Sequence, residues 1–433
     1  MKLELGQERV IVRGIRPEEQ LWGAYQFPIP YVLEDRILVG VHITIDDIRT
    51  YGATNRWFES TDLGRTWREV DAETAENQIG VKLPNGDIVS LPMESAFPLD
   101  GYRLTPYKYR TPGYDMTRQA EEGTLPIPDG VTSWMGGTDI FAYNADRLPP
   151  SLAKRQWLVK RLLPGQKQAQ MEYAELDWPY LTRVVHTQKG SVPVMKAISP
   201  RGYLRTGPDG ALWVTAFSGE GHLNPLNGQY SPYYSAELFR SEDNAHSFQQ
   251  VAHMEYEADG HHYPYASGGF SDSDIAFMPD GSMVWFFRSN WYASTGQEWS
   301  PMYWSRSTDF GRTWEKPRVF APYGTLPRLA RLDCGTVLVC YARPGMFISA
   351  SLNASGTQWS EPLMVETPGD RSHLANVVRT PPTFHDWDGA CNNPEIIPIG
   401  ENKALFFYSD FYYPDEHGVK RKTILCREIT VRD

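Results

Sequence analysis

The sequence predicts an all-β fold, a β-propeller built from four-stranded antiparallel blades. Three observations lead to this prediction: a motif that recurs along the chain, hairpin turn signals that precede short apolar runs, and an unusual composition. Aromatic residues make up 13% of the 433 residues, and the chain contains 36 Gly and 33 Pro. Such a composition suits many short strands joined by turns better than long helices.

The recurring motif is the strongest of these signals. Residues 60–67 (STDLGRTW) reappear as residues 307–314 (STDFGRTW), identical at every position except the fourth. A third copy at residues 241–248 keeps the serine, the aspartate and a terminal aromatic residue, and a fourth at residues 351–359 has Asn353 in place of the aspartate and one extra residue. Repetition of this kind is typical of a fold made from similar units.

The residue types in the motif predict a hairpin turn between two strands of one blade. An aspartate can accept hydrogen bonds from the N–H groups of the turn, a glycine allows positive φ, and a tryptophan can pack between neighbouring sheets. We therefore expect Asp62, Asp243 and Asp309 to be structural rather than catalytic.

The spacing of the motif predicts one domain over residues 1–433 with a single long insertion. Copies are 66 residues apart (307 minus 241) and then 44 apart (351 minus 307), which suits four-stranded blades. The interval from residue 60 to residue 241 is too long for one blade, so we place a second blade and an insertion there, the latter at about residues 100–196. Within the insertion, residues 150–170 are compatible with a helix. The insertion either covers the channel mouth or decorates the surface.

Charge and motif content limit the partners and cofactors. The formal net charge of −11 argues against nucleic acid or an anionic membrane as the main partner. No cofactor and no metal are expected, because the chain shows no Gly-rich phosphate loop, no HxxxH pair and no CxxC spacing among its four cysteines.

The N-terminal residues lack an apolar signal segment, and no stretch is apolar over the length needed to span a bilayer. These two features predict a cytoplasmic protein unless a signal peptide was removed. The four cysteines are expected to be mainly buried free thiols.

The motif copies and their spacing resemble the Asp boxes of sialidases (neuraminidases) and related propeller glycosidases, over most of the chain. This resemblance implies six blades and an oligosaccharide or glycoconjugate substrate. In that family three arginines hold the substrate carboxylate, a tyrosine activated by a glutamate is the nucleophile, and an aspartate is the acid/base.

The arginines and the glutamate of the family can be carried over position by position. The first arginine corresponds to Gln26, within Tyr25-Gln26-Phe27-Pro28. Glutamine lacks the positive charge and the paired N–H donors of a guanidinium. Arg288 matches the second arginine, seven residues after Gly281, and Arg343 is the candidate for the third. Asp272 stands where the family has its glutamate.

The acid/base and nucleophile positions complete the predicted site. Asp47, beside Asp46, lies where the family has its acid/base aspartate; a pair of like charges can raise one pKa toward the working pH, although two solvated loop carboxylates would look the same. The nucleophilic tyrosine corresponds to Asn393, which cannot form a covalent intermediate. Glu395, two residues later, is a candidate base.

Three functions remain open from the sequence. Two carboxylates without a tyrosine permit inverting hydrolysis of a terminal, acidic sugar, with Asp272, Asp47 and Glu395 as catalytic candidates. A polysaccharide lyase would instead use His42 or His385 with Tyr25 or Tyr51 to abstract a proton next to a uronate carboxylate. The third possibility is a propeller that binds glycans or proteins without catalysis.

Overall fold

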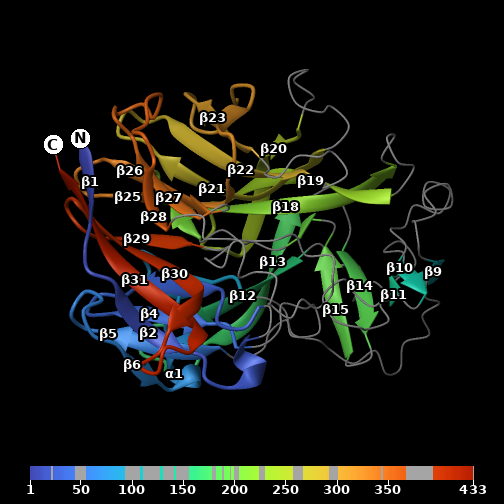
Figure 1. Cartoon of the computed structure of the whole chain (residues 1–433). Coiled ribbons are helices and arrows are strands. Elements are labelled where there is room, and N and C mark those ends of the chain that lie inside the picture. Colours follow the sequence, from blue (N-terminus) through green and yellow to red (C-terminus); the bar gives the residue numbers. More distant parts are fainter. Residues whose placement is uncertain are drawn as a thin grey trace.

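The chain folds into a ring of six blades, as the sequence predicted (Figure 1). The computed structural model describes residues 1–20, 23–43, 55–92, 108–110, 127–129, 141–142, 156–177, 182–187, 190–195, 197–198, 204–223, 230–256, 267–291, 301–342, 345–366 and 394–432.

Blades I to III come from the first part of the chain. Blade I contains β3 (Pro28–Val32), β4 (Ile37–Val41), β5 (Arg56–Ser60) and β6 (Arg68–Val70). Blade II contains β7 (Val81–Lys82), β8 (Ile88–Ser90), β12 (Gln156–Leu162) and β13 (Gln170–Asp177). Blade III contains β17 (Arg205–Thr206), β18 (Leu212–Leu223), β19 (Tyr230–Ser241) and β20 (Ser247–Met254), with β16 (Ala197–Ile198) also paired to β18.

Blades IV to VI complete the ring. Blade IV contains β21 (Ser267–Phe277), β22 (Met283–Trp291), β23 (Met302–Ser307) and β24 (Arg318–Ala321). Blade V contains β25 (Thr325–Arg331), β26 (Val337–Ala342), β27 (Met346–Ala350) and β28 (Leu363–Glu366). Blade VI contains β29 (Glu395–Gly400), β30 (Lys403–Pro414) and β31 (Lys420–Arg432), together with β1 (Lys2–Leu5) and β2 (Arg9–Arg13) from the N-terminus.

The N-terminal strands close the ring. Both β1 and β2 pair antiparallel with β31, so the first residues of the chain form the outer edge of the last blade. The first strands of neighbouring blades, β21, β25, β29 and β3, contact one another in that order around the axis. Residues that begin these strands therefore come together although they lie far apart in the sequence.

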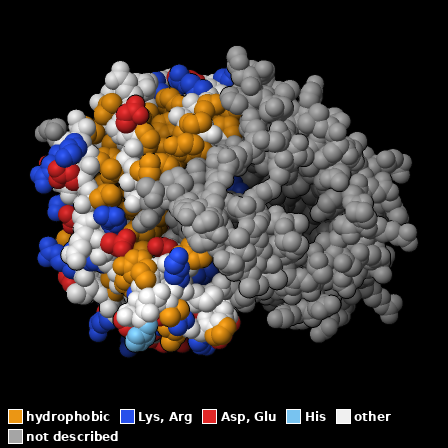
Figure 2. Space-filling view, in the orientation of Figure 1, with side chains coloured by type: hydrophobic (Ala, Val, Ile, Leu, Met, Phe, Trp, Pro, Cys, Tyr) orange, Lys and Arg blue, Asp and Glu red, His pale blue; other side chains and the backbone are white. Residues whose placement is uncertain are grey.

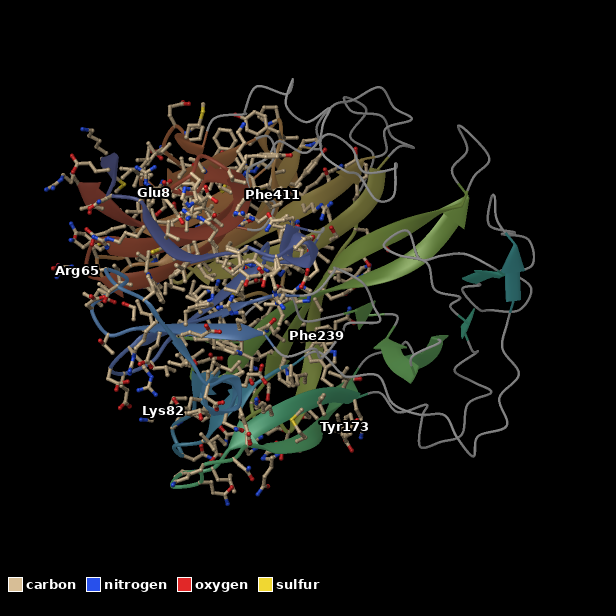
Figure 3. The ribbon with its side chains drawn as sticks, turned by 60° about the horizontal axis from the view of Figure 1, so that its bottom comes forward. Glu8, Arg65, Lys82, Tyr173, Phe239 and Phe411 are labelled. Atoms are coloured by element: carbon tan, nitrogen blue, oxygen red, sulfur yellow. The ribbon has the colours of Figure 1, made fainter. Side chains whose placement is uncertain are left out.

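The hydrophobic core lies between the blades, and the alternation of side chains along each strand explains why. On β22, Trp285 and Phe287 pack with residues of blade III, whereas Val284 and Phe286 pack with residues of blade V. Because both faces of such a strand are buried, it is an unbroken apolar run, which is the pattern that the sequence showed after its turn dipeptides. Phe239 of β19, labelled in Figure 3, is fully buried and packs against Trp157 of blade II.

The motif copies form the turns that the sequence predicted. In the first copy, the N–H groups of Arg65 and Thr66 donate to Asp62 Oδ1 at 3.0 and 2.8 Å, and Ser60 Oγ donates to the same oxygen at 2.8 Å. Gly64 has φ of +81°, and a Cβ there would lie 2.5 Å from Leu405 of blade VI. These contacts confirm that the aspartate holds a turn.

Each Asp-box turn also packs against the preceding blade. Trp67 of blade I contacts Phe407 of blade VI, and Trp359 of blade V contacts Phe286 of blade IV, with ring centroids 6.0 and 5.2 Å apart. The Asp boxes therefore form the turn after a strand and also pack neighbouring blades against each other. The second role is the one expected for the aromatic residue.

The predicted insertion and helix need correction. Residues 156–177 fall within the predicted insertion but form β12 and β13, which complete blade II by pairing with β8. The predicted helix over residues 150–170 is wrong, because Trp157, Val159 and Arg161 are buried with the period of two that a strand requires. Short strands occupy other described parts of residues 100–196, namely β9 (Lys108–Arg110), β10 (Ile127–Asp129), β11 (Phe141–Ala142), β14 (Thr182–Thr187) and β15 (Gly190–Met195).

Helices contribute little to the described structure. The short helix α1 (Ala72–Glu76) begins at Asp71, whose carboxylate accepts a hydrogen bond from the Thr74 N–H, and a 3-10 turn spans Pro17–Gln20. No helix in the described ranges has the length and apolar character needed to cross a bilayer.

On the face shown in Figure 2, Lys and Arg side chains are interspersed with Asp and Glu rather than gathered into one basic patch.

Candidate functional site

The strand directions define two faces of the propeller. In an antiparallel blade the third strand runs parallel to the first, so the Asp boxes, which follow third strands, lie at the face where the first strands end. We call this the Asp-box face. The opposite face, where the first strands β3, β21, β25 and β29 begin, we call the mouth face. The predicted site residues that the structure describes precede first strands, lie within them, or lie on the second strand beside them.

Asp272 and Arg288 form an ion pair in blade IV. Arg288 Nη1 lies 3.0 Å from Asp272 Oδ2, the Asp272 side chain is 5% exposed and the Arg288 side chain is 25% exposed. Arg288 ends the apolar run of β22, as the sequence indicated. The pair combines an enclosed carboxylate with a guanidinium that solvent can reach, and such a guanidinium can bind an anionic group.

Glu395 pairs with an arginine that the sequence analysis missed. Arg328 Nε lies 2.9 Å from Glu395 Oε1, and both side chains are buried. Arg328 lies within β25 and Glu395 begins β29, so the ion pair joins blades V and VI. An arginine inside the buried strand Thr325–Arg331 was the available signal, because arginine is rarely buried without a partner.

The charge of Glu395 also affects two neighbouring groups. The pKa of the Cys340 thiol on β26 and the pKa of the Tyr31 phenol on β3 are both raised. Burial is the larger cause in each case, and the negative charge of Glu395 adds to it. Both groups are therefore neutral near pH 7. Cys340 and Cys426 are buried free thiols, as expected, whereas Cys334 is exposed.

A third ion pair at the axis has a structural character. Asp274 is buried, and Arg205 of blade III donates from Nε to Asp274 Oδ1 at 2.9 Å. The backbone of Leu329 in blade V donates its N–H to Asp274 Oδ2 and accepts from Arg205 Nη2, both at 2.8 Å. Asp274 thus connects blades III, IV and V, although it lies only two residues from Asp272.

Gln26 lies at the joint between blades VI and I. It is fully buried, and its Oε1 accepts hydrogen bonds from the Gly23 N–H at 3.0 Å and from Lys422 Nζ at 3.5 Å. Its proposed contact with substrate stays a prediction. What the structure adds is Lys422, a cation from β31 placed beside the position where the resemblance implies an arginine.

Tyr25 and His42 are engaged within the protein. The Tyr25 hydroxyl bonds to Glu19 and accepts from Arg56, and burial raises its pKa although Arg56 opposes the rise. His42 Nδ1 lies 3.1 Å from the carbonyl oxygen of Gly23. If Tyr25 were the base of a lyase reaction, its buried hydroxyl would have to break its hydrogen bonds with Glu19 and Arg56.

The remaining predicted residues lie outside the described residues. They are Asp46, Asp47, Arg343, Asn393, His385 and Tyr51. Their roles stay predictions. Among the described residues, no group of three or more His, Cys, Asp or Glu side chains could hold a metal ion.

The described centre offers ion-paired carboxylates beside cations at one face of the ring. An ion-paired carboxylate is a proton acceptor, and a carboxylate that binds a proton from water can activate that water for attack. Arg288 and Arg328 can in addition stabilise negative charge on a ligand. The arrangement suits binding of an anionic ligand and base catalysis.

Comparisons with known proteins identify the fold. No protein family and no curated protein matches the sequence. A crystal structure of a protein of unknown function from Dyadobacter fermentans matches with a TM-score of 0.61 and 16% identity, over 99% of each chain. A Hadza microbial sialidase has a TM-score of 0.47 and 12% identity over 94% of this chain and 65% of that one. The α-L-arabinanase of Penicillium chrysogenum, complexed with arabinobiose, has 0.46 and 12% over 98% of both.

The blades and their turns define the class of the protein. The chain is an Asp-box six-bladed β-propeller, the fold that the sequence predicted. At 16% identity the match shows the fold alone, so the reaction has to be argued from the residues of this chain.

Proposed function

We propose that the chain is a glycoside hydrolase that removes a terminal sugar carrying an acidic group from a glycan. The observation that supports the proposal is the placement of two arginine–carboxylate pairs, Arg288 with Asp272 and Arg328 with Glu395, on the first two strands of blade IV and the first strands of blades V and VI. Arg288, the more exposed arginine, would bind the acidic group of the sugar.

The proposed reaction is an inverting hydrolysis, because Asn393 replaces the tyrosine of the resembled family. Glu395 accepts a proton from water as the water oxygen attacks the anomeric carbon. The bond from that carbon to the leaving oxygen breaks, and Asp47 donates a proton to the leaving oxygen. Asp272 keeps Arg288 in place through their ion pair.

The test is turnover of a panel of fluorogenic glycosides that includes an α-sialoside, uronides and deoxysugars. On a glycoside that is cleaved, Glu395→Gln and Asp47→Asn should each lower kcat by about 100-fold or more, the usual range for loss of a general acid or base. Arg288→Ala should raise KM. NMR of the first product should show the inverted anomer.

A matched control comes from the Asp-box face, where Arg240 pairs with Asp209 in the turn before β18. Asp209→Asn should leave turnover unchanged. Full activity of the Glu395→Gln and Asp47→Asn variants would reject the inverting mechanism. Cleavage of the sialoside with retention, abolished in Arg288→Ala, would show a sialidase with an unusual nucleophile.

A glycan-binding propeller without catalysis is the second candidate. It is favoured by one observation, that Asp272 and Glu395 are both already held by arginines in this structure. Binding of an oligosaccharide without turnover of any panel member would support this function over hydrolysis.

A further inference from the structure

Lys422 places a buried positive charge at the joint between blades VI and I. The residue lies on β31 and is 5% exposed, which is rare for lysine. Its Nζ donates to the carbonyl oxygen of Ala24 at 3.1 Å and to Gln26 Oε1 at 3.5 Å, and it lies 4.4 Å from the centroid of the Phe411 ring. Phe411, on β30, is labelled in Figure 3. Two oxygen dipoles and an aromatic face thus stabilise the ammonium group.

The position of Lys422 relates it to the mouth face. Ala24 and Gln26 immediately precede β3, the first strand of blade I, and the backbone of Lys422 is tied to the same region because its N–H donates to Gln20 Oε1 at 2.9 Å. Because β3 begins at the mouth face, the ammonium group lies on the side of the ring that carries Arg288 and Glu395.

Lys422 also explains why residue 26 is neutral. Gln26 Oε1 accepts from both the Gly23 N–H and Lys422 Nζ, which fixes the orientation of the amide. A guanidinium at residue 26 would stand next to the ammonium group in a buried place. Two like charges at that separation repel strongly where water is excluded.

We propose that Lys422 supplies the positive charge of this joint in place of an arginine at residue 26, and that this charge selects ligands with an anionic group. Lys422 is a positioning residue, since it acts through Gln26 and through its field rather than by direct contact with the reacting atoms. The inference rests on the proposed function only in taking the ligand to be an acidic sugar.

The first test measures coupling between the two positions by thermal unfolding. Gln26→Arg should lower Tm by about 5 °C or more, because it creates a buried pair of like charges. Gln26→Arg combined with Lys422→Met should recover at least half of that loss. Methionine has nearly the length of lysine, so the recovery would report removal of charge rather than of bulk. Additive effects of the two changes would overturn the inference.

The second test measures binding of D-glucuronate and of D-glucose by calorimetry or ligand-observed NMR, which requires no turnover. Lys422→Met should weaken glucuronate binding by about 10-fold, the loss expected when a positive charge a few ångströms away is removed from a place that excludes water, and leave glucose binding unchanged. The Gln26→Arg/Lys422→Met variant should regain glucuronate binding. Lys420→Met is the matched control, because Lys420 lies on the same strand, is exposed, and stacks over Tyr412 instead.

The outcomes separate this inference from the proposed hydrolase. Equal glucuronate binding by the wild type and Lys422→Met, or none by the wild type, would overturn the role of Lys422 even if a glycoside is cleaved. Selective loss of glucuronate binding in Lys422→Met, with no turnover of any glycoside, would support the role of Lys422 while the hydrolase proposal fails.

Discussion

The Asp-box turns and the first strands around the axis use carboxylates in opposite ways. On the Asp-box face, Asp62 and Asp309 bind N–H and hydroxyl groups no more than four residues away. Between the first strands of neighbouring blades, Asp274 pairs with Arg205 at a separation of 69 residues, and Glu395 with Arg328 at a separation of 67. An aspartate in a turn is satisfied before the blades assemble, whereas a carboxylate at the axis is satisfied only after they assemble.

The protonation of the Asp-box carboxylates follows from their local bonds. The hydroxyl and the N–H of Thr313 lower the pKa of Asp309 to about 2. For Asp62, burial alone would raise the pKa, but the hydroxyl and N–H of Thr66 outweigh it and lower the value to about 2. These acids are ionised over the whole physiological range and cannot donate a proton, in agreement with a structural role.

The largest effect is expected where a carboxylate joins three blades. Asp274→Ala should lower the free energy of unfolding by about 3–5 kcal/mol, because it removes the partner of Arg205 and the acceptor of the Leu329 N–H in a buried place. Urea unfolding would measure this loss. Asp272→Ala is the control, and a cost as large as that of Asp274→Ala would remove the distinction drawn between these two acids.

A smaller loss is expected on the Asp-box face. Asp243 accepts bonds from the hydroxyl groups of Ser241 and Ser247 and from two backbone N–H groups, so Asp243→Ala should cost about 1–2 kcal/mol by urea unfolding. Asp243→Asn should cost less, since Asn353 holds the equivalent turn of blade V. Equal costs for the two variants would mean that the turn does not depend on its acceptor oxygen.

The Asp-box face should lose part of its stabilisation in acid. The pKa of Asp309 is about 2 in the folded protein and 3.8 without the fold, so its contribution to stability is complete above about pH 4 and is lost as the pH falls toward 2. The stability difference between the wild type and Asp309→Asn, from unfolding in urea at several pH values, should therefore shrink between pH 4 and pH 2. A constant difference over that range would contradict the assignment of the low pKa to this carboxylate.

The smallest effect is a gain. Asn353→Asp should stabilise the protein by about 0.5 kcal/mol at pH 7, because a carboxylate oxygen accepts from the Thr357 N–H more strongly than an amide oxygen does. The Thr357 hydroxyl, to which Asn353 Nδ2 donates, would turn to donate to the second carboxylate oxygen. Careful comparison of urea midpoints would detect it. The reverse change, Asp243→Asn, provides the matched comparison in blade III, and a loss of stability in Asn353→Asp would show that the turn of blade V has adapted to the amide.

Sequence reasoning succeeded where the determining contacts are local. Residues close together in the chain determine the turns of the motif, their role, the apolar runs of the blades and the position of Arg288 directly after the apolar run of β22. The predicted helix over residues 150–170 failed because an apolar alternation of two was overlooked in Gln156–Leu162, the same pattern that assigns this segment to blade II.

The candidate site was harder to predict because its partners are distant. Arg328 was passed over in favour of Arg343, since nothing near Arg328 in the sequence reveals that Glu395 of the next blade lies 2.9 Å away. Arg205 and Lys422 were missed for the same reason. In the sequence, none of these basic residues differs from a surface residue. Only the closed ring places each of them against a partner from another blade.

The sequence by itself determined the repeating unit of this protein, because a hairpin turn is held by hydrogen bonds among a few consecutive residues. It also determined that several such units must stack, since their strands are apolar on both faces and cannot be buried alone. The tertiary structure alone decided which charges meet at the mouth face, because the closure of the ring by β1 and β2 brings blade VI against blade I. Buried charges require partners, and here those partners come from other blades.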